Sequence, residues 1–83
     1  MKKEAFLYFT EDCHLCELAS AEIEHCPIAS TYVIEKVDVA FDDKLFKRYG
    51  TQIPVLFCAG QALCWPFDEK AITVFFENIQ RTA

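Results

Sequence analysis

Apolar and polar residues follow one another along this chain in blocks that predict an order of strands and helices. Ala5–Phe9 is an unbroken apolar run, typical of a strand buried on both faces. From Cys13 the apolar positions recur at helical spacing, until Pro27 forbids a further turn. Tyr32–Val39 mixes β-branched residues with charges, which favours a strand at the edge of a sheet. The first half of the chain therefore predicts a β-α-β unit.

A short helix is expected next. Asp42 or Asp43 can cap its first turn, and Gly50 can end it. We expect its inward side to consist of Leu45, Phe46 and Tyr49.

Two further apolar runs predict a β-hairpin. Ile53–Cys58 has a proline at its entry, where a missing N–H is tolerated, and Ala62–Trp65 follows a turn at 59–61. Asp68 can then cap a last helix, whose apolar residues fall at i, i+3, i+4 and i+7: Ile72, Phe75, Phe76 and Ile79. The order β-α-β-α-β-β-α predicts one α/β domain over residues 1–83, a four-stranded mixed sheet with helices on both faces.

Charge and length limit the partners of this domain. The 83 residues carry 8 Lys and Arg against 13 Asp and Glu, a net charge of −5, with no basic cluster. Binding of nucleic acid or an anionic membrane needs a basic face, so we expect neither partner. No apolar stretch approaches the ~20 residues of a membrane span, and the run at 5–9 is too short for the core of a signal peptide. We expect a small acidic monomer.

Five cysteines are the feature that most needs an explanation. An odd number does not suit a fully paired secreted scaffold. We therefore expect the reducing cytoplasm, where cysteines are catalytic, metal-binding or simply buried.

Two of the cysteines, Cys13 and Cys16, are spaced C-x-x-C where the first strand meets the first helix. Residues i and i+3 of a helical turn lie about as close as a disulfide requires. The loop they close is too short to stabilise the fold much, so such a disulfide is suited to opening and closing. Unpaired N–H groups and the helix dipole favour a thiolate at Cys13, which therefore attacks, while Cys16 resolves.

Two other interpretations of the cysteine pair stay open. It could be half of a metal site, with His14, His25 and Cys26 as further ligands, but a second ligand pair at zinc spacing is missing. It could also be a coincidence in a cysteine-rich core. We predict no metal, since C-x-x-C opening a β-α-β unit is the redox context.

At this point the chain resembles the thioredoxin superfamily, and within it the small glutaredoxin-like proteins. The resemblance covers essentially the whole chain and rests on Cys13-His14-Leu15-Cys16, on Val37-Asp38-Val39, and on the segment 48–56, Arg-Tyr-Gly-Thr-Gln-Ile-Pro-Val-Leu. It implies a thioredoxin fold and a cis Ile53–Pro54 peptide facing the cysteine pair. The Ile53 backbone N–H and C=O would then pair with an extended substrate.

The chain departs from glutaredoxins that bind glutathione. These usually carry a Lys just before the first active-site Cys and a Gly-Gly pair before the last helix. Here Glu11-Asp12 and the segment 63–68, with Pro66, occupy those places. We expect no bound cofactor, and the departures argue against glutathione as a co-substrate without removing that alternative.

Three residues next to the pair can tune its reactivity. Glu11 and Asp12 oppose the helix dipole and leave the pKa of Cys13 less depressed. His14 as an imidazolium would stabilise the thiolate, or it simply faces solvent. Of the other cysteines, Cys58 and Cys64 could bridge across the hairpin if its turn has three residues, but we expect all three remaining cysteines to be buried thiols.

These features predict an enzyme, a thiol–disulfide oxidoreductase that exchanges dithiol and disulfide through Cys13 and Cys16. The substrate would be a disulfide-containing protein or a low-molecular-weight thiol. One alternative is a binding or adaptor module that keeps the fold and exchanges thiols slowly or not at all, which the acidic residues beside the pair favour. A metal or iron–sulfur carrier is the other.

Overall fold

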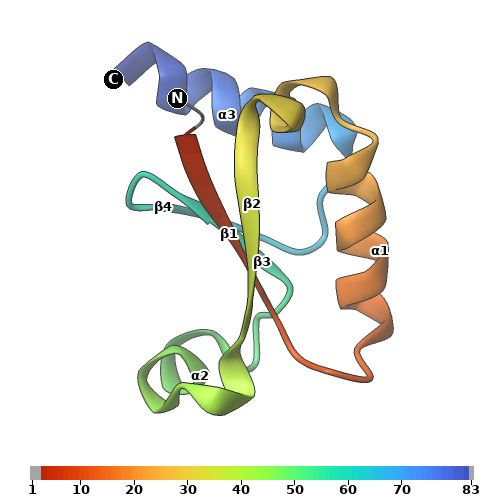
Figure 1. Ribbon diagram of the computed structural model, residues 1–83, viewed down its shortest axis with the longest axis vertical. Coiled ribbons are helices and arrows are strands. Elements are labelled where there is room, and N and C mark those ends of the chain that lie inside the picture. The colour runs from red at the N-terminus through yellow and green to blue at the C-terminus, as the bar shows by residue number, and fades with distance from the viewer. Residues whose placement is uncertain (1–2, 83) are drawn as a thin grey trace.

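The computed structural model describes residues 3–82, which form one four-stranded sheet with helices packed against it (Figure 1). The elements follow in the order β1 (Lys3–Phe9), α1 (His14–Glu24), β2 (Tyr32–Asp38), α2 (Asp43–Tyr49), β3 (Val55–Cys58), β4 (Gln61–Cys64) and α3 (Glu69–Thr82). Two 3₁₀ turns, η1 (Pro27–Thr31) and η2 (Val39–Phe41), flank β2. This order confirms the predicted β-α-β-α-β-β-α sequence of elements.

The sheet is mixed, and β1 lies at its centre. The strand order is β2-β1-β3-β4, with β1 parallel to β2 and antiparallel to β3. Leu7 is paired with Lys36 on one side and with Leu56 on the other. β1 is thus hydrogen-bonded along both edges, and β2 is an edge strand, as its charges predict.

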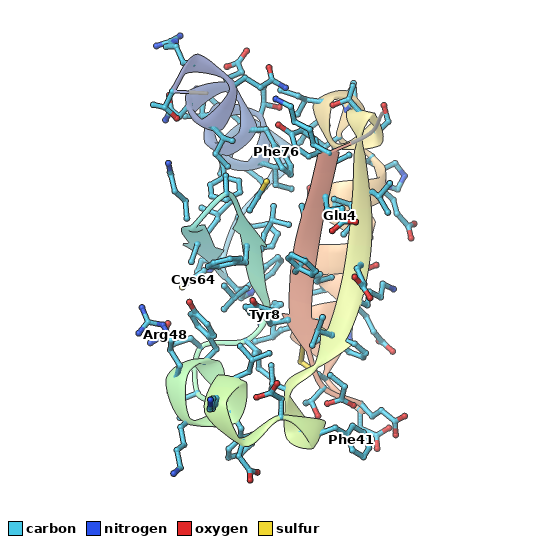
Figure 2. All side chains as sticks on the ribbon, turned by 60° about the vertical axis from the view of Figure 1, so that its left-hand side comes forward. Glu4, Tyr8, Phe41, Arg48, Cys64 and Phe76 are labelled. Carbon is cyan, nitrogen blue, oxygen red and sulfur yellow. A yellow bond between two sulfur atoms is a disulfide. The ribbon has the colours of Figure 1, made fainter. Side chains whose placement is uncertain are left out.

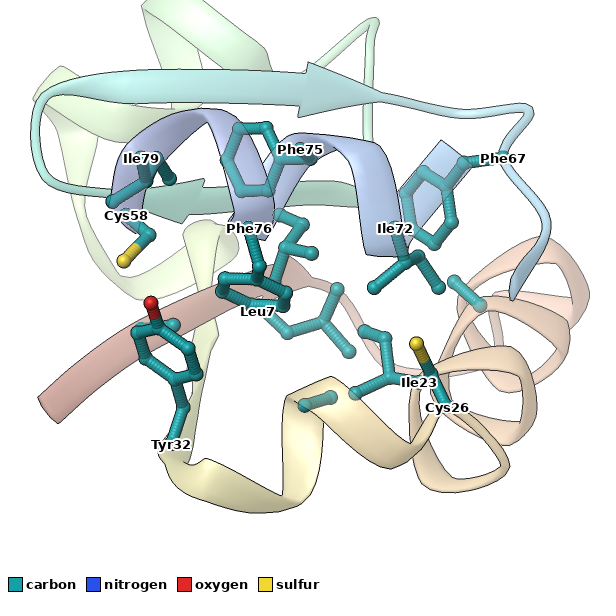
Figure 3. Packing of buried hydrophobic residues seen from close by; sticks show 14 residues of the cluster. Leu7, Ile23, Cys26, Tyr32, Cys58, Phe67, Ile72, Phe75, Phe76 and Ile79 are labelled. Carbon is teal, nitrogen blue, oxygen red and sulfur yellow. The ribbon is translucent and has the colours of Figure 1, made fainter. Parts of the chain in front are cut away.

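The larger core lies between the sheet and the helices α1 and α3 (Figure 3). Its buried members are Ala5, Leu7, Ala19, Ile23, Cys26, Ala29, Tyr32, Leu56, Cys58, Phe67, Ile72, Phe75, Phe76 and Ile79. The Phe76 ring stacks on the Tyr32 ring with centroids 4.2 Å apart, which joins α3 to the start of β2. Asp68 Oδ1 accepts a hydrogen bond from the Ala71 N–H at 2.8 Å, so the predicted cap and the predicted inward face of the last helix are both confirmed.

A smaller core lies on the opposite face of the sheet, under α2, and its buried members are Tyr8, Val39, Tyr49 and Val55. Asp42 caps α2 by accepting from the N–H groups of Lys44 and Leu45. The prediction that Phe46 faces inward was wrong, because its side chain is 56% exposed. Leu45 and Tyr49 are four residues apart and share the inward side, whereas Phe46 lies about 100° further round the helix. Arg48 and Phe41 lie at this α2 end of the molecule, away from Phe76 on α3 (Figure 2).

The hairpin between β3 and β4 has a two-residue turn, not the three-residue turn that the sequence predicted. Ala59 and Gly60 both have positive φ, 52° and 77°, which a type I′ turn requires. Gln61 therefore pairs with Cys58, and Cys64 pairs with Val55. Cys58 and Cys64 lie at opposite ends of the hairpin and do not bridge.

The helices of the described part of the chain are too short or too polar to cross a membrane.

The burial of an apolar side chain on α3 determines how much stability is lost when that side chain is shortened. Ile72→Ala removes a side chain that is 0% exposed, and we expect the free energy of unfolding to fall by about 2–5 kcal/mol. Val74→Ala in the same helix is the matched control, because Val74 is 46% exposed and should change stability by less than about 0.5 kcal/mol. Urea unfolding followed by circular dichroism measures both, and equal losses would contradict this packing.

Candidate functional site

Cys13 and Cys16 lie at the junction of β1 and α1, joined by a disulfide with a Cα–Cα distance of 5.2 Å. Cys13 is the N-cap residue of α1, with extended backbone at φ −108° and ψ 102°. Its Sγ accepts a hydrogen bond from the Cys16 N–H at 3.2 Å, in the way that a Ser or Asp oxygen does at other helix starts. The first turn of α1 thus directs one of its free N–H groups at this sulfur, a geometry that favours negative charge there.

The two sulfurs differ in accessibility. Cys13 is half-buried, whereas Cys16, within the first turn of α1, is 5% exposed. A molecule arriving from solvent can therefore reach Cys13 before Cys16. The division of roles between an attacking and a resolving cysteine stays a prediction, and this accessibility suits it.

The acidic residues before the pair are exposed at the turn that leads into α1. Asp12 has φ 56°, a left-handed conformation that reverses the chain between β1 and the helix. Asp tolerates this conformation better than most residues with a side chain. Glu11 and Asp12 line the same hollow as Cys13, so the structure brings these three predicted site residues together.

The His14 side chain faces solvent. Its side chain is 80% exposed, and Nδ1 lies 3.7 Å from Glu17 Oε2, one turn along α1. Among residues 3–82, Glu17 is the acidic residue that His14 contacts. The exposure of its side chain favours the interpretation that His14 faces solvent.

Ile53 and Pro54 lead into β3 and are joined by a cis peptide, as the resemblance implies. Because Tyr8 pairs with Val55, Pro54 lies at the same end of the sheet as the loop that carries Cys13. The expectation that the Ile53 N–H is open to a substrate was wrong, because it donates to the Tyr49 carbonyl at the end of α2 (3.0 Å).

A second cis peptide, Trp65–Pro66, was not predicted, and the Trp65 N–H donates to the Pro54 carbonyl at 3.1 Å.

The other three cysteines are thiols, and only two of them are buried. Cys26 and Cys58 are 1% and 4% exposed, and burial raises the pKa of the Cys58 thiol, opposed by a smaller effect of Lys3. Cys64 was predicted to be buried but is exposed on the edge strand β4, where its Sγ donates to Gln52 Oε1 at 3.4 Å.

The residues considered as further metal ligands lie apart from the pair. His25 Nδ1 is 2.7 Å from the Ala21 carbonyl at the end of α1, and the Cys26 sulfur lies 3.4 Å from Thr73 Oγ1 beside α3. Within the part of the chain that the structure describes, three or more His, Cys, Asp or Glu side chains do not gather as a ligand set.

A hollow of about 340 Å³ opens beside the disulfide, between α1 and the sheet. Sequence reasoning found Glu11, Asp12 and the two cysteines in its lining but missed Ser20, Glu24 and Lys36. The signal for Lys36 was present, because alternation along β2 puts it on the same face as Tyr32 and Ile34. The helix residues could not be assigned before the rotation of α1 over the sheet was known.

Burial predicts an order of alkylation for the three free thiols. Treated with iodoacetamide as the folded disulfide form, Cys64 should react more than about 100-fold faster than Cys26 or Cys58, because a buried thiol reacts only when the chain opens. Peptide mass spectrometry measures the three rates, and denaturant should make them nearly equal. Fast labelling of Cys58 in the folded protein would contradict the burial that raises its pKa.

The chain is similar to two solved structures and to one family model. A comparison with curated proteins gives no match. Two solved structures of Northeast Structural Genomics target protein XcR50 from X. campestris are similar to the chain. The X-ray structure is 29% identical with a TM-score of 0.74 and covers 89% of this chain and 96% of that one. The solution structure is 31% identical with a TM-score of 0.75, covering 89% and 92%.

The mixed sheet and these neighbours identify the architecture as a thioredoxin fold. The family model for the glutaredoxin-like domain (DUF836) matches residues 4–77, which includes both cysteines of the pair and the cis-proline segment. The chain therefore belongs to the glutaredoxin-like domain family (DUF836).

Proposed function

We propose that this protein is a thiol–disulfide oxidoreductase that works through Cys13 and Cys16. The observation that carries the proposal is the closed pair itself. A disulfide between an accessible helix-capping cysteine and a buried one is placed at the end of the central strand, where it closes only a short loop. A disulfide in this position contributes little to the fold and is available for exchange.

The reaction runs in two exchanges when the protein acts as a reductant. The Cys13 thiolate attacks one sulfur of a substrate disulfide, the substrate S–S bond breaks, and its other sulfur leaves as a thiolate that takes a proton. Cys16, once deprotonated, attacks Cys13 Sγ in the mixed disulfide, and the second substrate thiolate leaves. Two electrons have then passed to the substrate, and the Cys13–Cys16 disulfide has formed. An external thiol or dithiol must reduce it before the next cycle.

Two backbone groups near the pair assist the reaction, one at the Cys13 sulfur and one at the cis-proline segment. The Cys16 N–H that donates to Cys13 Sγ stabilises negative charge on the attacking sulfur, so it assists the first exchange. In the second exchange the negative charge passes from Cys16 to the departing substrate sulfur. The Ile53–Pro54 segment offers a neighbouring backbone surface, with the Ile53 carbonyl as the acceptor, since the N–H of that residue is already used.

The substrate class that we favour is a disulfide-bearing protein. The acidic turn at Glu11 and Asp12 is unfavourable for glutathione, which carries a net negative charge, so glutathione would be a poor co-substrate. We further propose that the protein works in the reducing cytoplasm as a monomer. Its three free thiols, one of them exposed, suit a compartment in which thiols stay reduced.

Single cysteine variants test the mechanism. Cys16→Ser should attack a disulfide once and stop as a stable mixed disulfide on Cys13, because the resolving sulfur is missing. Cys13→Ser should form no such adduct and lose turnover of a peptide disulfide by at least about 1000-fold. Cys64→Ser is the matched control and should keep full activity, since its sulfur lies on β4, outside the hollow beside the pair. Adducts in cell extract, identified by mass spectrometry, would name the substrates.

The outcome also separates the oxidoreductase from the adaptor alternative. A folded wild-type protein that reduces no disulfide, together with a Cys16→Ser variant that traps nothing, would overturn the proposal. It would favour a binding module that keeps the thioredoxin fold without the exchange.

A further inference from the structure

The hollow beside the disulfide continues along the molecule between α1 and β2. A second hollow of about 310 Å³ shares with it the four lining residues Leu7, Ser20, Glu24 and Lys36, so the two are contiguous. We call their union the α1–β2 groove. It begins at the turn that carries Glu11 and ends near Tyr32 at the start of β2.

This groove lies on a different flank of the disulfide from the cis-proline segment. Its strand residues come from β1 and from β2, whereas Ile53 and Pro54 lead into β3. The strand order β2-β1-β3-β4 puts β2 and β3 on opposite sides of β1. A polypeptide that reaches Cys13 can therefore extend into the α1–β2 groove independently of any contact with Pro54.

The hollow beside the disulfide, which forms the first part of the groove, is strongly acidic. Its lining contains four carboxylates, one ammonium group and no other charged side chain: Glu11, Asp12, Glu17, Glu24 and Lys36. Of these carboxylates only Glu17 has an ionic partner among residues 3–82, the exposed His14. The cations Lys44, Lys47 and Arg48 are on α2 and do not line the groove. Cys13, the attacking sulfur of the proposed reaction, thus lies at the edge of a surface with net negative charge, because one ammonium group offsets only one of the four carboxylates.

The floor of the groove is apolar where it passes the sheet. Leu7 and Phe9 of β1 line it together with the carboxylates, and Ala21 of α1 adds a further apolar side chain to the lining. Lys and Arg side chains match both properties, because their aliphatic stems pack on apolar surface while their charged ends stay among anions.

We propose that the α1–β2 groove selects substrate proteins with Lys or Arg close to the disulfide and disfavours anionic disulfides. This inference rests on the proposed oxidoreductase function and names its substrate class. The chemical step is the exchange described above, and the groove adds only recognition. Opposite charge raises the rate of encounter, and charges within a Debye length of about 8 Å remain effective at physiological salt.

Three synthetic peptide disulfides that differ only in flanking Lys, Ser or Glu residues test the selection. At about 20 mM salt, wild-type protein should reduce the Lys peptide about tenfold faster than the Glu peptide, with the Ser peptide between them, as expected at the lower end of electrostatic steering. At about 0.5 M salt the ratio should fall to within about twofold, because screening shortens the range of the field. Equal rates at low salt, or a faster Glu peptide, would overturn the proposal.

A matched pair of variants locates the effect. Glu17→Gln with Glu24→Gln removes two groove carboxylates, and the ratio of Lys to Glu peptide rates should drop to about threefold. Glu35→Gln with Glu77→Gln removes the same charge from positions outside the groove lining and should leave the ratio near its wild-type value. The same loss in both pairs would show an effect of net charge alone and would overturn the assignment to the groove.

Binding without turnover separates this inference from the proposed function. The disulfide form of the protein, titrated with the Lys peptide carrying Ser for Cys, should show amide NMR shifts at Ser20, Glu24 and Lys36 and none along α2, while the Glu peptide shifts none of these. If the Lys peptide binds in this way but no disulfide is ever reduced, the oxidoreductase proposal fails and the groove preference stands. If disulfides are reduced with no charge preference and no groove shifts, the groove proposal fails alone.

Discussion

The pairing of β1 along both of its edges is the constraint on which the rest of the molecule depends. Leu7 pairs with Lys36 of β2 and with Leu56 of β3, so the strand is enclosed by backbone on two sides and by side chains on two faces. After the last residue of β1, the chain leaves the sheet through the turn that leads into α1. The same pairing brings the entry of β3, with its cis-proline, to that end. The cysteine pair therefore follows shortly after a strand that is fixed on both edges, with Cys13 accessible from solvent and Cys16 buried.

The position of α1 joins this fold to its chemistry. A helix must satisfy its first N–H groups, and here the Cys13 sulfur accepts one of them, in a role that Ser, Thr, Asp or Asn usually fills. In the proposed mechanism, the hydrogen bond that caps the helix is therefore also the one that stabilises the Cys13 thiolate. Acidic residues line the groove that begins at this point: Glu11 and Asp12 lie in the turn, Glu17 lies in the first turn of the helix, and Glu24 is its last residue. In the proposed mechanism Glu11 and Asp12 weaken the stabilisation of a Cys13 thiolate at the helix start, and the net negative charge of the groove favours basic substrates.

Much of this arrangement was predictable from the sequence, since local signals determine it. The C-x-x-C spacing, the helix stop before Pro27 and the amphipathic pattern of Ile72 to Ile79 all describe interactions within one element. The errors concern relations between elements. Phe46 faces solvent because α2 contacts the sheet through Leu45 and Tyr49, and Cys64 is exposed because Ala59 adopts a positive φ that shortens the turn. The Ile53 N–H is occupied by the Tyr49 carbonyl, and Lys36 reaches the site through strand register. Each of these four features depends on how two elements are placed relative to one another, which residue type alone does not determine.

Reversible redox cycling of the isolated protein tests the central claim most directly. The pair is reduced with excess dithiothreitol and then reoxidised in a series of thiol–disulfide buffers, while mass spectrometry counts the thiols and circular dichroism follows the fold. In a Cys64→Ser background, which removes the exposed thiol, Cys13 and Cys16 should lose and regain two hydrogens reversibly while Cys26 and Cys58 stay thiols, and the protein should stay folded in both forms. A pair that cannot be closed again, or a chain that unfolds when the pair is reduced, would make the disulfide a structural bond and contradict the account.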